Sequence, residues 1–320
     1  MTTTTSSKII CDSVSPAGHR LTTFECVHPR IILAEVNTHK MLSKSSASSR
    51  AIPVEKMIAR VLEDPYVPTH WGKNQKGMQA EQDVSPDAGK FAAIEWEAAR
   101  DAAVEQAARL LKHGIHKQIT NRLLEPFMFH TALVTGTEWS NFFNLRDNKD
   151  AHPDFRDLAH AMRELYANGN PRALDYGDWH TPLVSPSEAF DIVVTNESEF
   201  PDAVCKISIG RCARVSYDKQ NEGEHPEKSI ARTDMMLASG HMAPFEHVAR
   251  PMTNLELAMF SQPKWRWVGN RWRWIGAEYH ENGDSVVLPG DRTHFLGNLN
   301  GWVQYRKLIP HEEDILGARS

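Results

Sequence analysis

The sequence predicts an α/β (α+β) fold in which short strands are combined with long helices. Runs rich in apolar and β-branched residues at positions 9–14, 21–27 and 127–134 are typical of strands. Residues 88–113, rich in Ala and Glu, and residues 152–168 carry apolar side chains at the helical spacing. The chain has 320 residues, of which 41% are hydrophobic and 24% charged, so it can bury a sizeable core.

The remaining elements are expected at signals for turns, caps and first-turn prolines. Pro29 and Pro53 each stand where a helix can begin. The other expected elements are a turn at 15–18, a short helix at 119–124, a helix from Trp139 to Arg146 capped by Thr137, helices at 204–216 and 228–239 with Gly240 as the stop of the second, a weak strand at 252–260 and a last helix at 302–308. Residues 64–87 and 171–201 contain several prolines and lack a clear period, which indicates long connections. We interpret residues 1–320 as one domain with a possible internal junction at 171–201.

Composition and charge argue against several classes of protein. The net charge of −5 argues against a general nucleic-acid coat, and no apolar run is long enough to cross a membrane. The opening MTTTTSSKII lacks the basic and apolar regions of a secretory signal. Cys11, Cys26, Cys205 and Cys212 form no C-x-x-C pair, so we expect a cytoplasmic protein with reduced, buried thiols and no metal site.

One stretch, residues 35–50 with the sequence EVNTHKMLSKSSASSR, combines many hydroxyl groups with cations. It is expected to begin as the end of a helix and to continue as a loop, because dense serines compete for backbone hydrogen bonds. Serine hydroxyls beside His39, Lys40 and Arg50 are suited to hold an anion, with phosphate as the first choice. A solvated surface loop explains the composition equally well.

The spacing in this stretch resembles a known signature. From His39 the pattern is H-K-x-x-S-x-S-x-x-S-x-R, which is similar to R-H-R-x-x-S-x-N-x-x-S-x-R of the flavin-dependent thymidylate synthases. His39, Ser43, Ser48 and Arg50 match this signature. Three positions differ, since the family's two arginines and its asparagine are replaced by Thr38, Lys40 and Ser45.

Further stretches resemble the same family. NRLLEP at 121–126 is similar to A-R-x-x-L-P, and NFFNLR at 141–146, followed by AHPDF, is similar to N-F-L-x-L-R followed by A-Q-x-E. CARVSYD at 212–218 and GHMAPFEH at 240–247 are similar to A-R-V-S-F-D and G-H-x-T-P-F-E-H. In the family these last two precede the serine-rich signature, whereas here they follow it. The resemblance therefore implies a permuted member, in which GHMAPFEH must lie beside residues 35–50.

The resemblance assigns roles to individual residues. Arg146 is the candidate catalytic residue, because a guanidinium against the pyrimidine edge stabilises negative charge on the ring. The candidate substrate-binding residues are Arg50, Ser48, Ser49, Ser46, Arg122 and Glu35, and the candidate cofactor-binding residues are His39, Lys40, Ser43, Asn141, His241, Ser216 and Thr38. Plainer alternatives are a helix-end cation for Arg146, a helix cap for His241, and a salt bridge or buried hydrogen bond for Glu246 and His247.

The resemblance implies a mixed sheet with long helices and an FAD-dependent thymidylate synthase. Such an enzyme methylates dUMP to dTMP with methylenetetrahydrofolate and NADPH, as a homotetramer whose sites lie between subunits. A C5-methylase or hydroxymethylase of UMP or dCMP is the alternative within the class.

A single-strand nucleic-acid-binding protein is the alternative outside the class, through the Trp- and Arg-rich residues 264–279. The net negative charge of the chain argues against this alternative.

Two further positions differ from the family, because Thr135 and Thr137 stand where the family has the Asn and Arg of N-x-R. Residues 264–273 are expected to replace the lost arginines, to stack on a folate ring or simply to pack as aromatic side chains.

Overall fold

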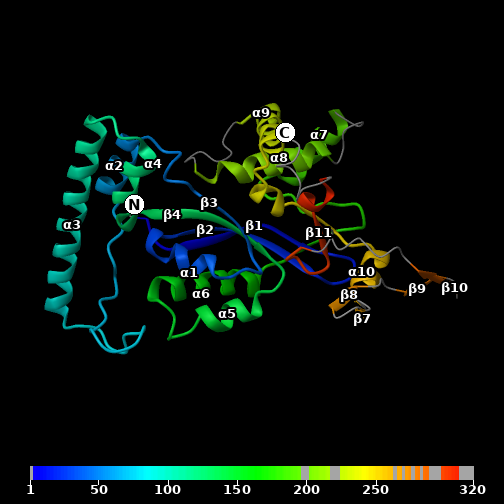
Figure 1. Cartoon of the computed structure of the whole chain (residues 1–320), viewed down its shortest axis with the longest axis horizontal. Helices are drawn as coiled ribbons and strands as arrows, with labels where there is room; N and C mark the ends of the chain where they lie inside the picture. Colours follow the sequence, from blue (N-terminus) through cyan, green and yellow to red (C-terminus); the bar gives the residue numbers. More distant parts are fainter. Residues whose placement is uncertain are drawn as a thin grey trace.

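The fold was obtained as a computed structural model, shown in Figure 1. It describes residues 3–195, 202–216, 224–261, 265–268, 271–274, 278–281, 284–287 and 297–309, with the backbone alone at 193–195, 216 and from 258 to 287. The α/β class expected from the sequence is confirmed, because a mixed sheet lies between layers of helices (Figure 1).

The main sheet contains five described strands in the order β3-β4-β2-β1-β5. In that order they are β3 (Ser43–Ser46), β4 (Phe129–Gly136), β2 (Arg20–Pro29), β1 (Ser6–Val14) and β5 (Arg172–Ala173). All neighbours are antiparallel except β1 and β5, which are parallel. The strands expected at 9–14, 21–27 and 127–134 are β1, β2 and β4. The expected turn between the first two is also present, with Gly18 at a φ of +85°.

One face of the sheet is covered by α1 (Leu33–Asn37), α5 (Ser140–Arg146) and α6 (Pro153–Asn168). Side chains alternate between the two faces of a strand, and Phe24 and Cys26 of β2 point to this face. They pack there against Phe155, Leu158 and Met162 of α6. This cluster confirms the amphipathic helix expected at 152–168.

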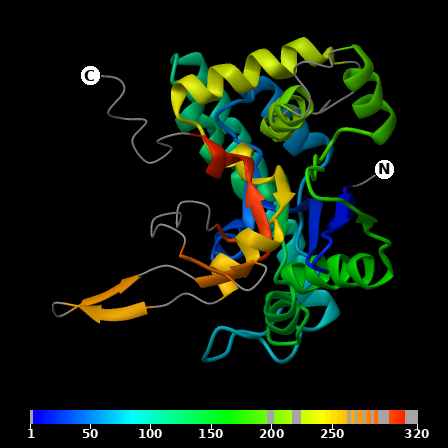
Figure 2. The ribbon, with the colours of Figure 1, turned by 90° about the vertical axis from the view of Figure 1, so that its right-hand side faces the viewer.

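The opposite face is covered by the C-terminal part of the chain. It contains α7 (Pro186–Thr195), α8 (Asp202–Cys212), α9 (Pro226–Ser239), and the 3-10 turns η4 (Ala213–Ser216) and η5 (Ala243–Glu246). The paired strands β6 (Ala249–Pro251) and β11 (Trp302–Gln304) complete this layer. Leu133 of β4 packs against Cys212 and Val215, and Leu21 of β2 packs against Trp302. Figure 2 shows the yellow-green helices of this layer above the sheet and the green helices α5 and α6 below it.

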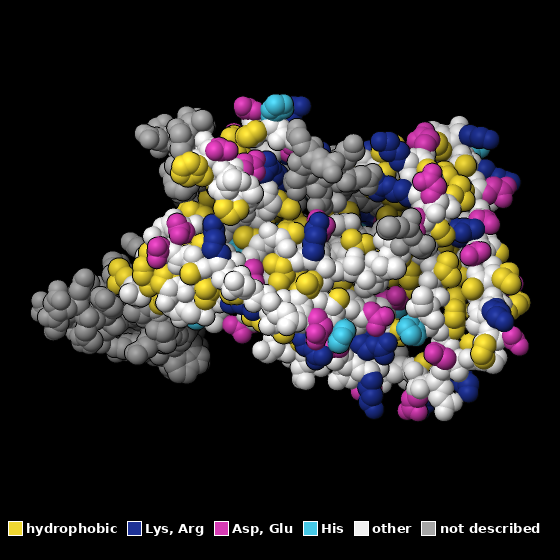
Figure 3. All heavy atoms as spheres, turned by 180° about the vertical axis from the view of Figure 1, so that it is seen from behind, with side chains coloured by type: hydrophobic (Ala, Val, Ile, Leu, Met, Phe, Trp, Pro, Cys, Tyr) yellow, Lys and Arg dark blue, Asp and Glu magenta, His cyan; other side chains and the backbone are white. Residues whose placement is uncertain are grey.

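A third group of helices stands at the end of the sheet. It contains η1 (Arg30–Ile32), α2 (Val54–Glu63), α3 (Pro86–Lys112), α4 (Lys117–Thr120), η2 (Asn121–Leu123) and η3 (Glu125–Phe127). Trp96 of α3 packs on a buried cluster that includes Met57 and Phe127. The rest of α3 is largely open, and Phe91 and Ile94 are each 64% exposed. Hydrophobic side chains are visible along this end, at the right of Figure 3.

The structure corrects several expectations about local structure. Residues 43–46, expected to be loop, form β3 because their backbone pairs with β4, and pairing between distant segments overrides the local preference of serine. Thr137 does not cap α5, whose N-cap residue is Trp139. The hydroxyl of Thr137 instead accepts a hydrogen bond from the backbone N–H of Asn300, at 3.0 Å.

The C-terminal part differs more from expectation. Residues 186–195, inside the expected long connection, are helix α7. The expected strand at 252–260 is replaced by helix α10 (Asn254–Ser261). Thr253 and Glu256 form a capping box at the start of α10. The Glu256 N–H donates to the Thr253 hydroxyl (3.2 Å), and the Thr253 N–H donates to the Glu256 carboxylate (2.8 Å). The expected helix at 302–308 begins as β11 and continues as the 3-10 turn η7 (Tyr305–Leu308).

Other expectations are confirmed. Gly240 ends α9 in the left-handed conformation, with a φ of +73°. Four further strands, β7 (Trp265–Val268), β8 (Arg271–Trp274), β9 (Glu278–Glu281) and β10 (Asp284–Val287), form two antiparallel pairs. Their side chains lie outside the described part, so the roles expected for residues 264–279 stay untested. All four cysteines are free, and Cys26, Cys205 and Cys212 are buried.

Candidate functional site

Arg146, at the C-terminal end of α5, is held by two neighbours on the α1 side of the sheet. Its Nε donates a hydrogen bond to Nε2 of His39 at 2.8 Å, and its Nη2 donates to the hydroxyl of Thr38 at 3.3 Å. The guanidinium also lies over the ring of Phe155, 4.7 Å from the ring centre. Nη1 donates to no residue in the described part of the chain. The Arg146 cluster, defined here as Arg146, His39 and Thr38, therefore brings three of the expected site residues together.

His39 accepts the hydrogen bond from Arg146 as a neutral imidazole. Burial, followed by the nearby charges of Arg146 and Lys44, lowers the pKa of His39 to about 4. The ring stands edge-on to Phe142, with 5.0 Å between ring centres. A neutral ring has one nitrogen that accepts, and here that nitrogen is Nε2. His39 therefore fixes the direction of the Arg146 side chain.

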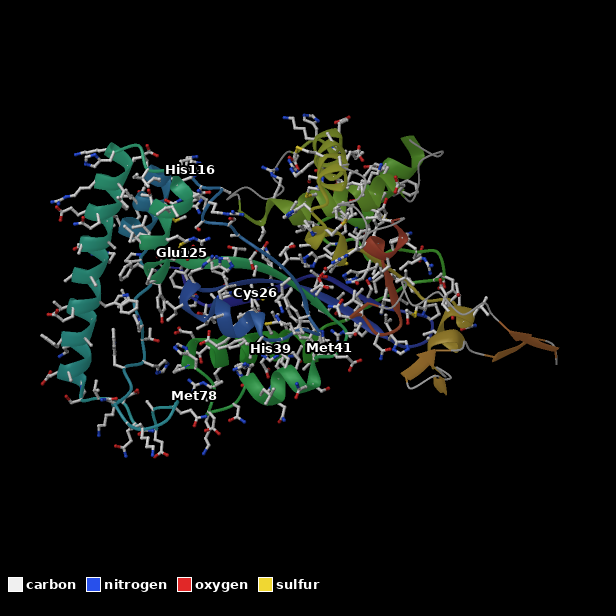
Figure 4. The ribbon with its side chains drawn as sticks, in the orientation of Figure 1. Cys26, His39, Met41, Met78, His116 and Glu125 are labelled. Atoms are coloured by element: carbon white, nitrogen blue, oxygen red, sulfur yellow. The ribbon has the colours of Figure 1, made fainter. Side chains whose placement is uncertain are left out.

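A second group of expected site residues gathers at the other end of the sheet, around Glu125. Its Oε1 accepts hydrogen bonds from the hydroxyl of Ser49 at 2.6 Å, from Nη1 of Arg122 at 2.7 Å and from Nη2 of Arg30 at 3.3 Å. The amide of Asn121 donates to the backbone carbonyls of Ser49 and Ile52, at 2.7 and 2.9 Å. Figure 4 shows His39 beside α1 and α5, and Glu125 at the start of β4. No hydrogen bond or ion pair joins the Glu125 cluster (Glu125, Ser49, Arg122 and Arg30) to the Arg146 cluster.

β3 runs between the two clusters and is clamped by the C-terminal part of the chain. The hydroxyl of Ser43 accepts from the amides of Asn298 and Gln304, at 3.0 and 3.1 Å. The same Gln304 amide donates to the backbone carbonyl of Glu246, at 3.0 Å. Ser45 lies 2.9 Å from Nε2 of His247. The expectation that GHMAPFEH lies beside the serine-rich stretch is thus confirmed.

His247 also belongs to a chain of buried hydrogen bonds that crosses four strands of the sheet. Its Nδ1 contacts the hydroxyl of Thr135 at 2.7 Å, and Thr135 contacts the hydroxyl of Thr23, also at 2.7 Å. Thr23 contacts Nε2 of His180 at 2.8 Å, and Nδ1 of His180 contacts Ser13 at 2.9 Å. Burial lowers the pKa of His247 to about 4, and burial with the charge of Arg172 lowers that of His180 to about 3. The buried-hydrogen-bond reading of His247 is therefore confirmed, and Glu246 forms the other expected contact, an ion pair with Arg306.

The remaining expected residues are placed as follows. Lys40, Arg50 and Asn141 are exposed, and their side chains hydrogen bond to no described residue. His241 is exposed as well, while its backbone N–H closes the end of α9 by donating to Met236 at 3.0 Å. Ser46 and Ser48 are partly buried, and Glu35 has a buried Oε2 without a partner among the described residues. The side chain of Ser216 lies outside the described part.

Several side chains that contact the expected site residues were not predicted from the sequence, among them Arg30, Glu125, Asn298 and Gln304. Glu125 stands where the family's A-R-x-x-L-P has Leu, and this departure from the motif is the sequence signal for a carboxylate beside Arg122. Asn298 and Gln304 carry no local signal, because their contacts with Ser43 join residues more than 250 positions apart. Within the described residues, no group of three His, Cys, Asp or Glu side chains is arranged to hold a metal ion. No described helix is both long and apolar enough to span a membrane.

Comparison with known proteins identifies the family. The model of the family described as "Thymidylate synthase complementing protein" matches residues 9–172, just over half of the chain. None of the curated proteins compared with the chain matches it. Solved structures of the UMP/dUMP methylase PolB from Streptomyces cacaoi, bound with 5-Br UMP and with 5-Br dUMP, are similar at 17% identity. They cover 52% of this chain and 90% and 91% of that chain, with TM-scores of 0.44 and 0.42.

The family match contains both clusters and β3. The two motifs expected to be displaced, at 212–218 and 240–247, lie beyond the matched residues. η4 and η5, which these motifs form in part, nevertheless pack against β3. The chain therefore belongs to the thymidylate synthase complementing protein family, the flavin-dependent family that its motifs resemble.

Proposed function

We propose that this protein is an FAD-dependent thymidylate synthase that converts dUMP to dTMP. The observation that carries the proposal is the Arg146 cluster. The guanidinium donates through Nε to His39 and through Nη2 to Thr38 and lies over the face of Phe155, while Nη1 donates to no described residue and is available for a ligand. Arginine keeps its proton under all working conditions, so this edge is a permanent donor.

Arg146 would polarise the pyrimidine ring. Methylation at C5 needs an electron-rich ring, and negative charge then develops over N3 and O4. A preorganised donor at that edge stabilises the charge without reorganising during the reaction. His39 and Thr38 contribute by fixing the guanidinium before the substrate arrives, which lowers the entropic cost of orientation.

The phosphate of the nucleotide would be held by the last residue of β3 and the segment that follows it. Arg50 is exposed and Ser46 and Ser48 are partly buried, so this segment presents a cation and hydroxyls. Asn121 and the Glu125 cluster anchor its far end, and β3 anchors its near end. Glu35 and Arg122 complete the proposed nucleotide-binding set, together with Ser49.

The side chains proposed for the cofactor suit a flavin nucleotide. Lys40 and His241 are exposed donors for phosphate, and Asn141 is an exposed amide for a ring edge. Thr38, Ser43 and Ser216 complete this set with His39, although the Ser43 hydroxyl is already engaged by Asn298 and Gln304. Bound FAD, reduced by NADPH, would supply the hydride that completes the methyl group brought by methylenetetrahydrofolate. The chain's own share is binding, orientation and polarisation.

A homotetramer is part of this proposal. Among the described residues, no hydrogen bond or ion pair joins the Arg146 cluster to the Glu125 cluster, and a site completed by residues of another subunit would fit this arrangement. The open face of α3, with Phe91 and Ile94, offers apolar surface for such an assembly. We further propose that the enzyme works in the cytoplasm.

One experiment tests the function. Purified protein is loaded with FAD, its absorption spectrum is recorded, and dUMP, UMP and dCMP are compared as substrates with methylenetetrahydrofolate and NADPH. The expected result is a flavin spectrum and a methylated product from dUMP. Product from UMP or dCMP alone would replace the proposed substrate, and a protein that takes up no flavin would overturn the proposal.

Nucleotide binding is tested separately with Arg50→Ala. Loss of this cation is expected to weaken dUMP binding by about 2 kcal/mol, with FAD content unchanged. An unchanged dUMP affinity would remove Arg50 from the site.

A further inference from the structure

We propose that Glu125 is a specificity-determining residue of the nucleotide site, an internal carboxylate that competes with the substrate's phosphate for Arg122. This inference rests on the proposed function. It concerns the chain's own residues only, and the test below needs neither flavin nor turnover.

The geometry of Glu125 is that of an anion already bound. Three donors from three segments converge on its Oε1: the hydroxyl of Ser49 at 2.6 Å, Nη1 of Arg122 at 2.7 Å and Nη2 of Arg30 at 3.3 Å. A hydroxyl and two guanidinium groups are the donors that a phosphate oxygen also selects. The carboxylate thus already holds the exposed donor, Arg122, that a phosphate would need.

The three donors differ in their freedom to leave Glu125. Arg30 is fixed, because its Nη1 also contacts the Ala47 carbonyl at 3.1 Å and Nδ1 of His130 at 2.8 Å. Ser49 is 3% exposed and its backbone is held by Asn121. The side chain of Arg122 is 49% exposed, and its ion pair with Glu125 is the one that it makes among the described residues. Arg122 is therefore the donor that can turn from the carboxylate to a phosphate.

The charge of Glu125 acts against a phosphate dianion at this place. Like charges at close range repel, and the Glu125 side chain is only 19% exposed, so water screens the repulsion weakly. Binding of a nucleotide monophosphate must overcome this repulsion and break the Arg122–Glu125 pair. A nucleoside, which has no phosphate, has neither cost. Glu125 therefore lowers affinity for the phosphorylated ligand selectively.

The test compares dUMP with deoxyuridine by titration calorimetry on the purified protein and on Glu125→Gln. Glutamine keeps an oxygen acceptor for Ser49, Arg122 and Arg30 but has no charge. We expect Glu125→Gln to bind dUMP about tenfold more tightly, while its affinity for deoxyuridine stays unchanged. The matched control is Asp157→Asn, which removes an exposed carboxylate that also contacts an arginine, Arg156, on α6. Its affinity for dUMP is expected to equal that of the unmodified protein.

A double mutant identifies the shared donor. If Glu125 and phosphate compete for Arg122, the gain from Glu125→Gln shrinks to less than threefold when Arg122→Ala is also present. A full gain in the Arg122→Ala background would overturn the role of Arg122. Equal or weaker dUMP binding by folded Glu125→Gln would overturn the inference as a whole, because a purely structural Glu125 gives no gain.

Two further outcomes are possible: Glu125→Gln fails to fold, or no form of the protein binds a pyrimidine nucleotide. If Glu125→Gln does not fold, as judged by circular dichroism, Glu125→Asp decides the inference instead. It draws the carboxylate away from Arg122 and is expected to tighten dUMP about threefold, and no gain would overturn the inference. If the unmodified protein and every variant bind no pyrimidine nucleotide at all, the proposed function fails, together with the inference that rests on it.

Discussion

Nε2 of His247 lies 2.9 Å from the hydroxyl of Ser45, and this contact fastens the C-terminal part of the chain to β3. Both side chains are buried, and Nδ1 of the same ring contacts Thr135 at 2.7 Å. A neutral imidazole has one donor and one acceptor nitrogen, so one of these hydroxyls donates to the ring and the other accepts from it. His247 therefore joins two strands of the sheet, and the chain of hydrogen bonds continues from Thr135 through Thr23 to His180.

Replacing His247 by Leu is expected to destabilise the fold by about 3 kcal/mol, because buried hydroxyls lose their partner. Leucine fills much of the volume, so the loss reports the hydrogen bonds more than a cavity. Urea unfolding followed by circular dichroism measures the change. The control is His70→Leu, at an exposed position of the 64–85 loop, which is expected to change stability by less than about 0.5 kcal/mol. Equal stability of both variants would show that the His247 contacts contribute nothing.

Acid should destabilise this protein between about pH 6.5 and pH 4. The pKa of His247 is lowered to about 4 in the folded protein, so the unfolded chain binds more protons in this window. Stability therefore falls as the pH falls, by up to about 1.4 kcal/mol per pH unit for each such histidine, and these histidines add no pH dependence above the window. His180, with a pKa of about 3, adds to the same slope. In His247→Leu the free energy of unfolding is expected to depend less steeply on pH, because the contribution of His247 is removed. An unchanged slope would contradict the lowered pKa of His247.

Arg146→Lys separates ring polarisation from the rest of the proposed reaction. Lysine keeps the charge but lacks the planar fork and the Nε that His39 accepts from. Methylation of dUMP is expected to fall about 100- to 1,000-fold, which is typical for loss of one preorganised donor. FAD binding and NADPH oxidation do not need a polarised pyrimidine and are expected to persist. Stopped-flow flavin reduction and product analysis measure the two steps, and near-normal methylation would leave Arg146 as a helix-end cation.

Gly210 is required where α8 crosses α9. A Cβ atom at Gly210 would lie 2.2 Å from the backbone oxygen of Ser229, so the two helices would have to separate. Gly210→Ala is therefore expected to destabilise the C-terminal layer by about 3 kcal/mol. The matched control is Gly89→Ala in α3, where a Cβ atom meets only Trp71, at 3.6 Å. That variant is expected to be neutral or more stable by about 0.5–1 kcal/mol, because alanine favours a helix. The melting temperatures of the two variants are compared by thermal unfolding. Equal melting temperatures would contradict the close approach of α8 and α9.

Local patterns in the sequence were sufficient for the class of fold and for most of its elements. The strands β1, β2 and β4 and the helices α3, α6, α8 and α9 follow from periodicity, caps and turn residues, which act between near neighbours. The family also follows from the sequence, because motif residues keep their spacing when whole segments are reordered. The contact between η5 and β3, inferred from the permuted motifs, is the one long-range relationship that could be inferred in this way.

Only the tertiary structure decided what the serine-rich residues contact. Residues 43–46 are a strand because β4 offers them backbone partners, and no local preference of serine predicts this. Ser45 meets His247 across 202 positions of sequence, and Ser49 meets Glu125 across 76. Hydrogen bonds between such distant residues form only once the sheet and its covering layers have brought them together, so the donors that remain available for a ligand cannot be read from the sequence alone. The sequence supplied the chemical groups, and the packing of the C-terminal layer on β3 determined which of them are already engaged.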